Sequence, residues 1–157
     1  MKIKRYSINL SEQMAACDGN YIRILKLLPD LSAGRVREIA IPGAESVPHI
    51  VFVIEVLERF KYTSTLRISQ RRPGAARDIY QPPEMLVRIY HDANTAEVVA
   101  YQNHRHFNAG YPAPNSQMYQ ADEKDQLNRF LTDWLNLCLQ KGVCNDEMSE
   151  LLTYAEP

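Results

Sequence analysis

The adjacent residues His91 and Asp92 are the pair in this sequence best suited to chemistry. A histidine titrates near neutral pH and a neighbouring carboxylate can orient its ring, so the pair has the composition of a general acid–base site. His91 also continues the alternation of Met85, Val87 and Ile89, which predicts a hydrogen-bonded position at the edge of a core. Asp92 then serves as a turn residue. We favour this structural interpretation over catalysis.

A second polar group, Arg67, Arg88, Tyr90 and Glu97, is expected on one face of a sheet. If a two-residue turn joins the strands of a hairpin, Tyr90 lies opposite Glu97 and Arg88 lies diagonally from it. Arg67 belongs to a neighbouring alternating strand and can face the same way. The group predicts a ligand-binding face. The structural alternative is a solvated face whose Arg–Glu pairs contribute about 0–1 kcal/mol each.

Two other clusters have the composition of metal sites but have simpler explanations. His104 and His106 would face one way on a strand, yet no third ligand has suitable spacing. Asp122, Glu123 and Asp125 stand where a helix begins, and a helix N-terminus favours negative side chains. We therefore predict no metal site. The sequence also lacks the common nucleotide-binding and hydrolase motifs, so no cofactor is expected, and a protein that is not an enzyme is favoured.

Composition describes an ordinary globular protein of 157 residues with a net charge of −1. Such a charge gives no general attraction to nucleic acid or anionic lipid, and no apolar run approaches the ~20 residues that cross a membrane. Three cysteines occur without a Cys-x-x-Cys pair or a signal peptide. This usage predicts reduced thiols in a cytoplasmic protein.

Periodic apolar residues predict a helix near each end of the chain. One covers residues 9–28, with Asn9 as its cap and Gly19-Asn20 as a place where it can kink. The other covers residues 122–141 and presents one apolar stripe. Five strands are expected between them, at residues 35–41, 48–57, 62–71, 84–91 and 95–102.

Short links between these strands favour an antiparallel meander. The predicted fold is therefore α+β, an antiparallel sheet of about five strands flanked by N- and C-terminal helices that pack on one sheet face. We expect a single domain over residues 1–157, with its core at 5–142 and a short C-terminal extension at 143–157.

The two longest motifs lie in the second half of the chain. They read Arg88-Ile89-Tyr90-His91-Asp92-Ala93 with Ala96-Glu97-Val98, and Asp122-Glu123-Lys124-x-Gln126-x-Asn128-x-Phe130-Leu131-x-Asp133-Trp134-Leu135. With these motifs the chain resembles the YqiB-like family of uncharacterised bacterial proteins, from about residue 5 to Gly142. The resemblance implies no established activity. The histidine pair at 104 and 106 and the longer tail after Gly142 depart from the family pattern.

Taken together, the residues favour a small binding or adaptor domain that uses the polar sheet face and the aromatic segment 103–121. A first alternative is an enzyme acting on a small anionic, phosphorylated metabolite, with Arg67 or Arg88 holding the anion and His91 as acid–base. RNA binding through the arginines between positions 59 and 88 is a second alternative, although no recognised RNA-binding motif accompanies them. The expected partner is a protein or a small anionic ligand.

Overall fold

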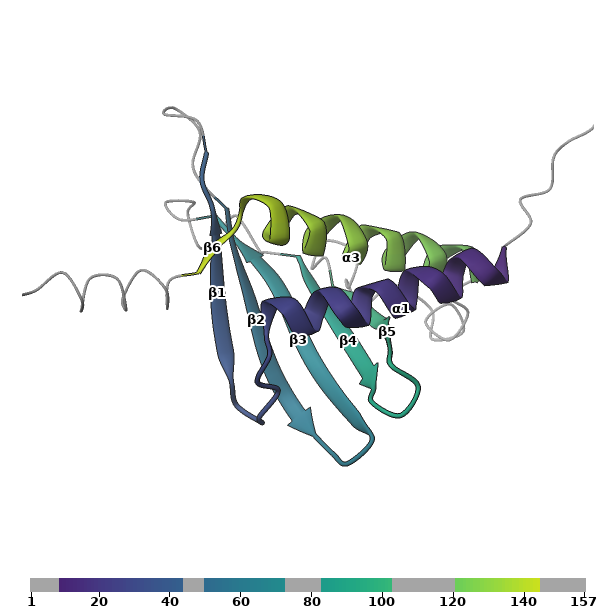
Figure 1. Ribbon diagram of the computed structural model, residues 1–157. Coiled ribbons are helices and arrows are strands. Elements are labelled where there is room, and N and C mark those ends of the chain that lie inside the picture. Colours follow the sequence, from purple (N-terminus) through teal and green to yellow (C-terminus); the bar gives the residue numbers. More distant parts are fainter. Residues whose placement is uncertain (1–8, 44–49, 73–82, 103–120, 145–157) are drawn as a thin grey trace, which may run out of the picture.

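A computed structural model describes residues 9–43, 50–72, 83–102 and 121–144 of the protein. Within these ranges, strands form one antiparallel sheet and two helices cross one of its faces (Figure 1). The predicted α+β class is therefore confirmed. The strands are β1 (Val36–Ile41), β2 (Ile50–Arg59), β3 (Thr63–Arg71), β4 (Glu84–Tyr90), β5 (Thr95–Gln102) and β6 (Val143–Cys144), and the helices are α1 (Leu10–Leu27) and α3 (Ala121–Lys141).

The sheet has one strand more than the meander expected from the sequence. Its order is β5-β4-β3-β2-β1-β6, and β6 pairs with β1 so that Cys144 lies opposite Ile39. Gly142 allows the chain to turn from α3 directly into β6, because a Cβ there would collide with the Cys138 carbonyl and with Ile39. A strand of two residues is too short to produce a periodic signal in the sequence.

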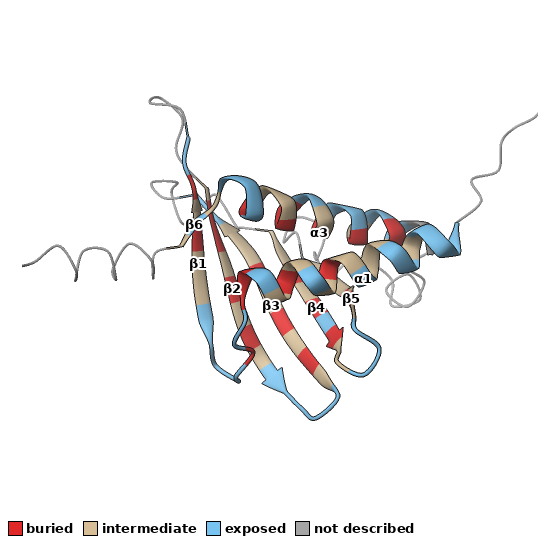
Figure 2. Cartoon of the chain, viewed as in Figure 1, coloured by how far each residue is buried: buried red, intermediate tan, exposed pale blue. Residues whose placement is uncertain are grey.

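Alternate strand residues face the helices and build the core (Figure 2). The Trp134 ring of α3 packs edge-on against Phe52 of β2, with ring centroids 5.3 Å apart. Each large apolar side chain that is buried in this way contributes about 1.5–3 kcal/mol. The fully buried strand residues include Phe52, Ile54, Val56, Leu66, Ile68, Met85 and Ile89.

Helix α1 begins as the sequence predicts and runs without a break. The Asn9 side-chain oxygen accepts hydrogen bonds from the backbone N–H groups of Ser11 and Glu12, as an N-cap does. The kink considered at Gly19-Asn20 does not occur, since the helix is continuous from Leu10 to Leu27.

The periodic apolar residues that predict α1 do not all lie on its most buried face. Leu10 and Met14 are exposed, whereas Tyr21 and Leu25 are half-buried and Ile24 is fully buried. Spacing predicts which residues share a face of a helix, but it does not show how the helix is rotated against its neighbours. As a consequence, Tyr21 and Leu25 lie at the margin of the core, where they line a hollow.

Buried polar residues fix α1 and α3 against the edge of the sheet. The Asn128 side chain accepts a hydrogen bond from the Val98 N–H of β5 at 2.8 Å. The Asn128 carbonyl accepts from the Asn20 side chain at 3.2 Å, and the Thr132 hydroxyl donates to Asn20 at 2.8 Å. These bonds satisfy an edge-strand N–H and set the position of α1 over the sheet.

The three cysteines Cys17, Cys138 and Cys144 are free thiols. Burial raises the pKa of Cys17 to about 11 and that of Cys138 to about 12. These two thiols therefore remain protonated at neutral pH, which makes them poor nucleophiles. No helix in the described part of the chain is both long enough and apolar enough to cross a membrane.

Candidate functional site

The predicted polar group does share the sheet face that the helices leave open, but its pairing differs from the expectation. Arg88 lies opposite Glu97, and Tyr90 lies opposite Thr95. The predicted Tyr90–Glu97 register is wrong because four residues, His91 to Asn94, connect β4 to β5. Asn94 adopts a left-handed conformation with φ of 53° in this turn. The Tyr90 hydroxyl still reaches Glu97 diagonally and donates a hydrogen bond of 2.9 Å.

Neighbouring side chains balance the charges on this open face. The Arg67 guanidinium lies 3.2 Å from the Glu55 carboxylate and 3.8 Å from that of Glu84. Glu97 accepts from Tyr90 and lies 3.6 Å from Lys124 of α3. Partial burial and the hydrogen bond to Glu97 raise the pKa of Tyr90 above its usual value. Arg67, Tyr90 and Glu97 therefore have partners within the fold.

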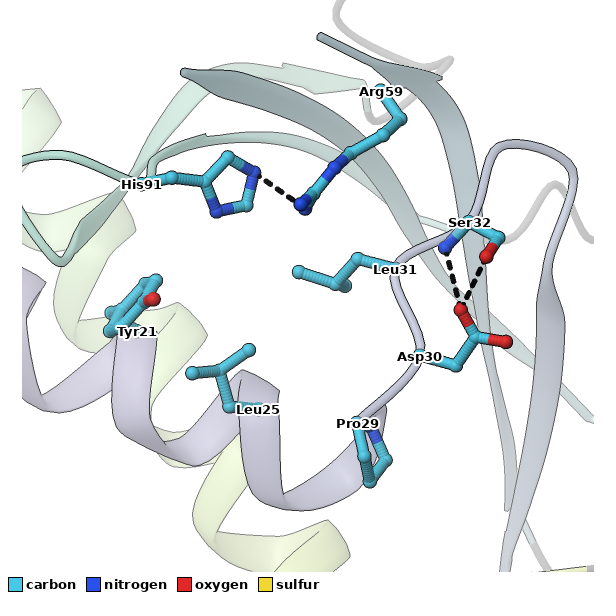
Figure 3. A pocket seen from close by; sticks show the side chains of 8 residues that line it. All are labelled: Tyr21, Leu25, Pro29, Asp30, Leu31, Ser32, Arg59 and His91. Carbon is cyan, nitrogen blue, oxygen red and sulfur yellow. Dashed lines mark hydrogen bonds between the residues drawn. The ribbon is translucent and has the colours of Figure 1, made fainter. Parts of the chain in front are cut away.

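A hollow of about 390 Å³ lies on the other side of the sheet, next to α1 (Figure 3). His91 and Arg59 project into it from the strand ends, and Leu31 points into it from the connection after α1. The complete lining is Tyr21, Leu25, Pro29, Asp30, Leu31, Ser32, Arg59 and His91. Of the residues in the two predicted polar groups, only His91 lines the hollow, and Asp92 lies exposed in the adjacent turn.

A β-bulge in β2 brings Arg59 to this side of the sheet. Val56 pairs with Leu66 and faces the helices, and regular alternation from Val56 would direct Arg59 to the open face. The register shifts by one residue between Val56 and Glu58, so Arg59 pairs with Ser64, a fully buried residue of the helix-covered face. A bulge often re-aims a side chain next to a functional site.

Arg59 and Ser64 hold one nitrogen of the His91 ring. The Arg59 Nη1 atom lies 2.9 Å from His91 Nε2, and the Ser64 hydroxyl lies 2.7 Å from the same nitrogen. A guanidinium has only donors, so Nε2 must be the unprotonated nitrogen and the ring proton resides on Nδ1. In Figure 3 the Nδ1 edge of the ring faces α1 across the hollow. His91 thus presents an N–H donor to the hollow.

Burial lowers the pKa of His91, and the neighbouring Arg59 cation lowers it further, while Asp92 acts in the opposite direction. His91 is therefore neutral at physiological pH. Asp30 is the one acid of the lining, but its carboxylate accepts two hydrogen bonds from Ser32 and turns away from the hollow (Figure 3). Those bonds lower the pKa of Asp30 below its ordinary value.

The contact between Ser64 and His91 has the distance of a nucleophile–base pair but not its accessibility. Ser64 is fully buried and does not line the hollow. Its hydroxyl is better suited to orienting the His91 ring than to attacking a substrate. Among the described residues, no group of three His, Cys, Asp or Glu side chains could hold a metal ion. The remaining groups that face the hollow are donors suited to binding an anion.

Sequence reasoning found His91 and missed Ser64, and it considered Arg59 only among the arginines of the RNA-binding alternative. Nothing in the sequence signals the bulge that redirects Arg59. Ser64 has one signal, since it is a polar residue in phase with Leu66 and Ile68 on an otherwise apolar face. Residues 103–120 lie outside the described residues, and they include the histidine pair at 104 and 106 and nearly all of the segment expected at 103–121. Residues 145–157 of the extension expected at 143–157 lie outside them as well.

The arginines on which the RNA-binding alternative rests have different surroundings. Arg59 faces the hollow, Arg67 contacts Glu55 on the open face, and Arg71 contacts Glu38 at 3.2 Å. Arg67 and Arg71 share the open face but each lies beside a glutamate, whereas Arg59 is on the other side of the sheet. RNA binding stays a prediction from the sequence.

The fold is that of an α+β domain in which helices cover one face of an antiparallel sheet. The chain belongs to the family described as "Protein of unknown function (DUF1249)", which matches residues 23–144. It is 36% identical over 144 residues to the "Uncharacterized protein YqiB" of Escherichia coli strain K12, covering 90% of this chain and 96% of that protein. The protein of the same name from Escherichia coli O157:H7 matches equally. The resemblance to the YqiB-like family is thus confirmed, and no solved structure matches the chain significantly.

Proposed function

We propose that the protein is a binding domain for a small organic anion and that the hollow beside His91 is its binding site. One observation carries the proposal: Arg59 projects into the hollow and contacts a neutral imidazole and a hydroxyl. Among the described residues, Arg59 has no carboxylate within ion-pair distance. An accessible guanidinium that is already held in place is a good anchor for an anion.

A binding role fits this geometry better than proton transfer does. The basic nitrogen of His91 already accepts from Arg59 and Ser64, so it is not open to take a proton from a substrate. The Nδ1 N–H group can still donate to a bound anion. The proposal keeps the binding role expected from the sequence but moves the site from the open sheet face to the hollow. A cytoplasmic location is part of the proposal and is supported by the three free thiols.

Calorimetric titration with benzoate tests this assignment. Benzoate is a small anion, and Arg59→Gln removes the positive charge while keeping a side chain of similar polarity. We expect Arg59→Gln to bind at least about tenfold more weakly than wild type, because a hydrogen bond to a charged group contributes about 1.5–3 kcal/mol. The control Arg67→Gln makes the same change on the open face and should bind as wild type does. Equal affinity in wild type and Arg59→Gln would overturn the proposal.

The enzyme alternative is separated by a second measurement. Wild type and His91→Gln are incubated with a panel of phosphorylated metabolites, and released phosphate is measured. The binding proposal expects no turnover by either protein. Turnover by wild type that disappears in His91→Gln would replace the binding proposal with the enzyme alternative.

A further inference from the structure

We infer that the ligand of the hollow is a singly charged organic acid, a carboxylate with an apolar body, and not a phosphorylated compound. This inference rests on the proposed function and narrows its chemistry. Three features carry it: the number of charges around the hollow, the arrangement of its donors, and the side chains of its opposite wall.

The charges around the hollow balance one negative charge and not two. Arg59 is its one cation among the lining residues, and His91 is neutral because its Nε2 accepts from Arg59. Asp30 turns toward Ser32, and the nearby cation of Arg35 opposes its charge. A phosphate monoester carries about −1.5 to −2 at neutral pH, so a large part of its charge would have no counter-charge in this site.

The backbone around the hollow also differs from that of a phosphate site. Phosphates often bind at helix N-termini, where backbone N–H groups point at the ligand. The hollow instead adjoins the C-terminal end of α1, because Leu25 and Pro29 line it. The helix end there carries partial negative charge, which opposes a dianion more strongly than a monoanion. Arg37 donates to the Leu27 carbonyl at this helix end but does not line the hollow.

The donors have the geometry that a carboxylate requires. One nitrogen of Arg59, Nη1, is directed to His91 and Ser64. Within the described part of the chain this leaves the Nε and Nη2 N–H groups, a planar fork that matches the two oxygens of a carboxylate.

The wall opposite Arg59 and His91 includes several carbon-rich side chains. Figure 3 shows Tyr21 and Leu25 of α1 below the two donors and Leu31 beside them. A volume of about 390 Å³ is toward the small end of ligand sites, which span about 300–1,000 Å³. A ring or short branched chain attached to the carboxylate would contact these side chains and lose water.

Calorimetric titrations near pH 8 with four probes separate the effects of the ligand's charge, the shape of its anionic group and its apolar body. Benzoate is a planar monoanion, benzenesulfonate a tetrahedral monoanion, phenyl phosphate a tetrahedral dianion, and acetate a carboxylate without a ring. We expect benzoate to bind at least about tenfold more tightly than phenyl phosphate, since the second charge lacks a partner. Benzenesulfonate should fall nearer to benzoate than to phenyl phosphate. Acetate should bind at least about tenfold more weakly than benzoate, because it buries little apolar surface.

The outcomes distinguish this inference from the proposed function. If phenyl phosphate binds as tightly as benzoate in a manner that Arg59→Gln abolishes, the hollow binds anions but the charge assignment is overturned. If acetate binds as tightly as benzoate, the inference that the ligand has an apolar body is overturned. Failure of all four probes to bind wild type at millimolar concentrations would overturn the proposed function itself. The control Arg67→Gln should reproduce the wild-type order of affinities.

Discussion

The two faces of the sheet use arginine in different ways. On the open face, the Arg67 guanidinium lies 3.2 Å from Glu55, so its charge is balanced by a neighbouring strand. On the helix-covered face, Arg59 lies 2.9 Å from a neutral histidine and near a buried serine. The two residues have the same chemistry and lie on adjacent strands, yet of the two only Arg59 lines the hollow next to α1.

This contrast shows that a cluster of charged residues is a weak sign of a binding site by itself. A polar face with acids and bases on alternate strands can satisfy its own charges, and each exposed pair then contributes about 0–1 kcal/mol. A site requires a charged group whose partners are neutral and which a ligand can reach. Among the described residues, Arg59 meets that condition. Arg67 on the open face does not, because its partner Glu55 is a carboxylate.

Reversing the charge of Arg59 should have the largest effect. In Arg59→Glu a carboxylate stands where the anion binds, and placing like charges together costs several kcal/mol. We expect benzoate affinity to fall by more than about a hundredfold, measured by calorimetry. The matched change Arg88→Glu, on the open face, should leave the affinity unchanged. If Arg88→Glu lowers benzoate affinity more than Arg59→Glu does, the binding site lies on the open face and not in the hollow.

Removing one hydroxyl should have an intermediate effect. Ser64 and Thr65 are neighbours in β3, and Ser64 faces the helices while Thr65 faces away. Ser64→Ala removes the hydroxyl that helps to hold His91, and a hydrogen bond contributes about 0.5–1.5 kcal/mol. Benzoate affinity should therefore fall about two- to tenfold. Thr65→Ala serves as the control, and thermal unfolding shows whether either variant folds; an equal loss in both would remove Ser64 from the site.

A substitution on the open face should lower the stability of the fold and leave anion binding unchanged. Tyr90→Phe removes the hydrogen bond to Glu97 but leaves Glu97 beside Lys124. We expect the free energy of unfolding in urea to fall by about 0.5–1.5 kcal/mol. Benzoate affinity should stay at the wild-type value. Weaker binding with unchanged stability would show that Tyr90 belongs to a site on this face.

The smallest expected effect concerns pH. Burial and Arg59 lower the pKa of His91 in the folded protein, and Asp92 opposes this shift in part. The unfolded chain therefore binds more protons than the folded protein just below about pH 6.5. His91 therefore contributes stability above its unfolded pKa, and this contribution is lost as pH falls through its folded pKa. Urea unfolding of wild type should show this loss as the pH falls below about 6.5, and His91→Gln should lose less. Identical pH profiles in wild type and His91→Gln would contradict the conclusion that His91 is neutral in the folded protein.

Much of the fold could be predicted from the sequence because period-2 and period-3.6 patterns are strong over long elements. Strands β1 to β5 and both helices lie close to their expected positions, and the Asn9 cap was predicted from the residue type. Strand β6 was not, because two residues carry no period. The hydrogen bond from Val98 to Asn128 also depends on tertiary contact, although Asn128 is part of the family motif.

The candidate site was harder to predict because it depends on two local irregularities. A bulge of one residue between Val56 and Glu58 reverses the direction of Arg59, and a turn of four residues changes the partners of Tyr90. Alternation rules fail after each irregularity, since a shift of one residue moves a side chain to the other face. His91 was found because its face follows from the regular part of β4 that precedes it.

The most direct test of the account is a nuclear magnetic resonance titration of the labelled protein with benzoate. The backbone and side-chain shifts report which face of the sheet the anion contacts. We expect the largest changes in the hollow, at Tyr21, Leu25, Leu31, Arg59 and His91 Nδ1. Changes centred instead on the open face, at Arg67, Arg88, Tyr90 and Glu97, would contradict the assignment of the site to the hollow.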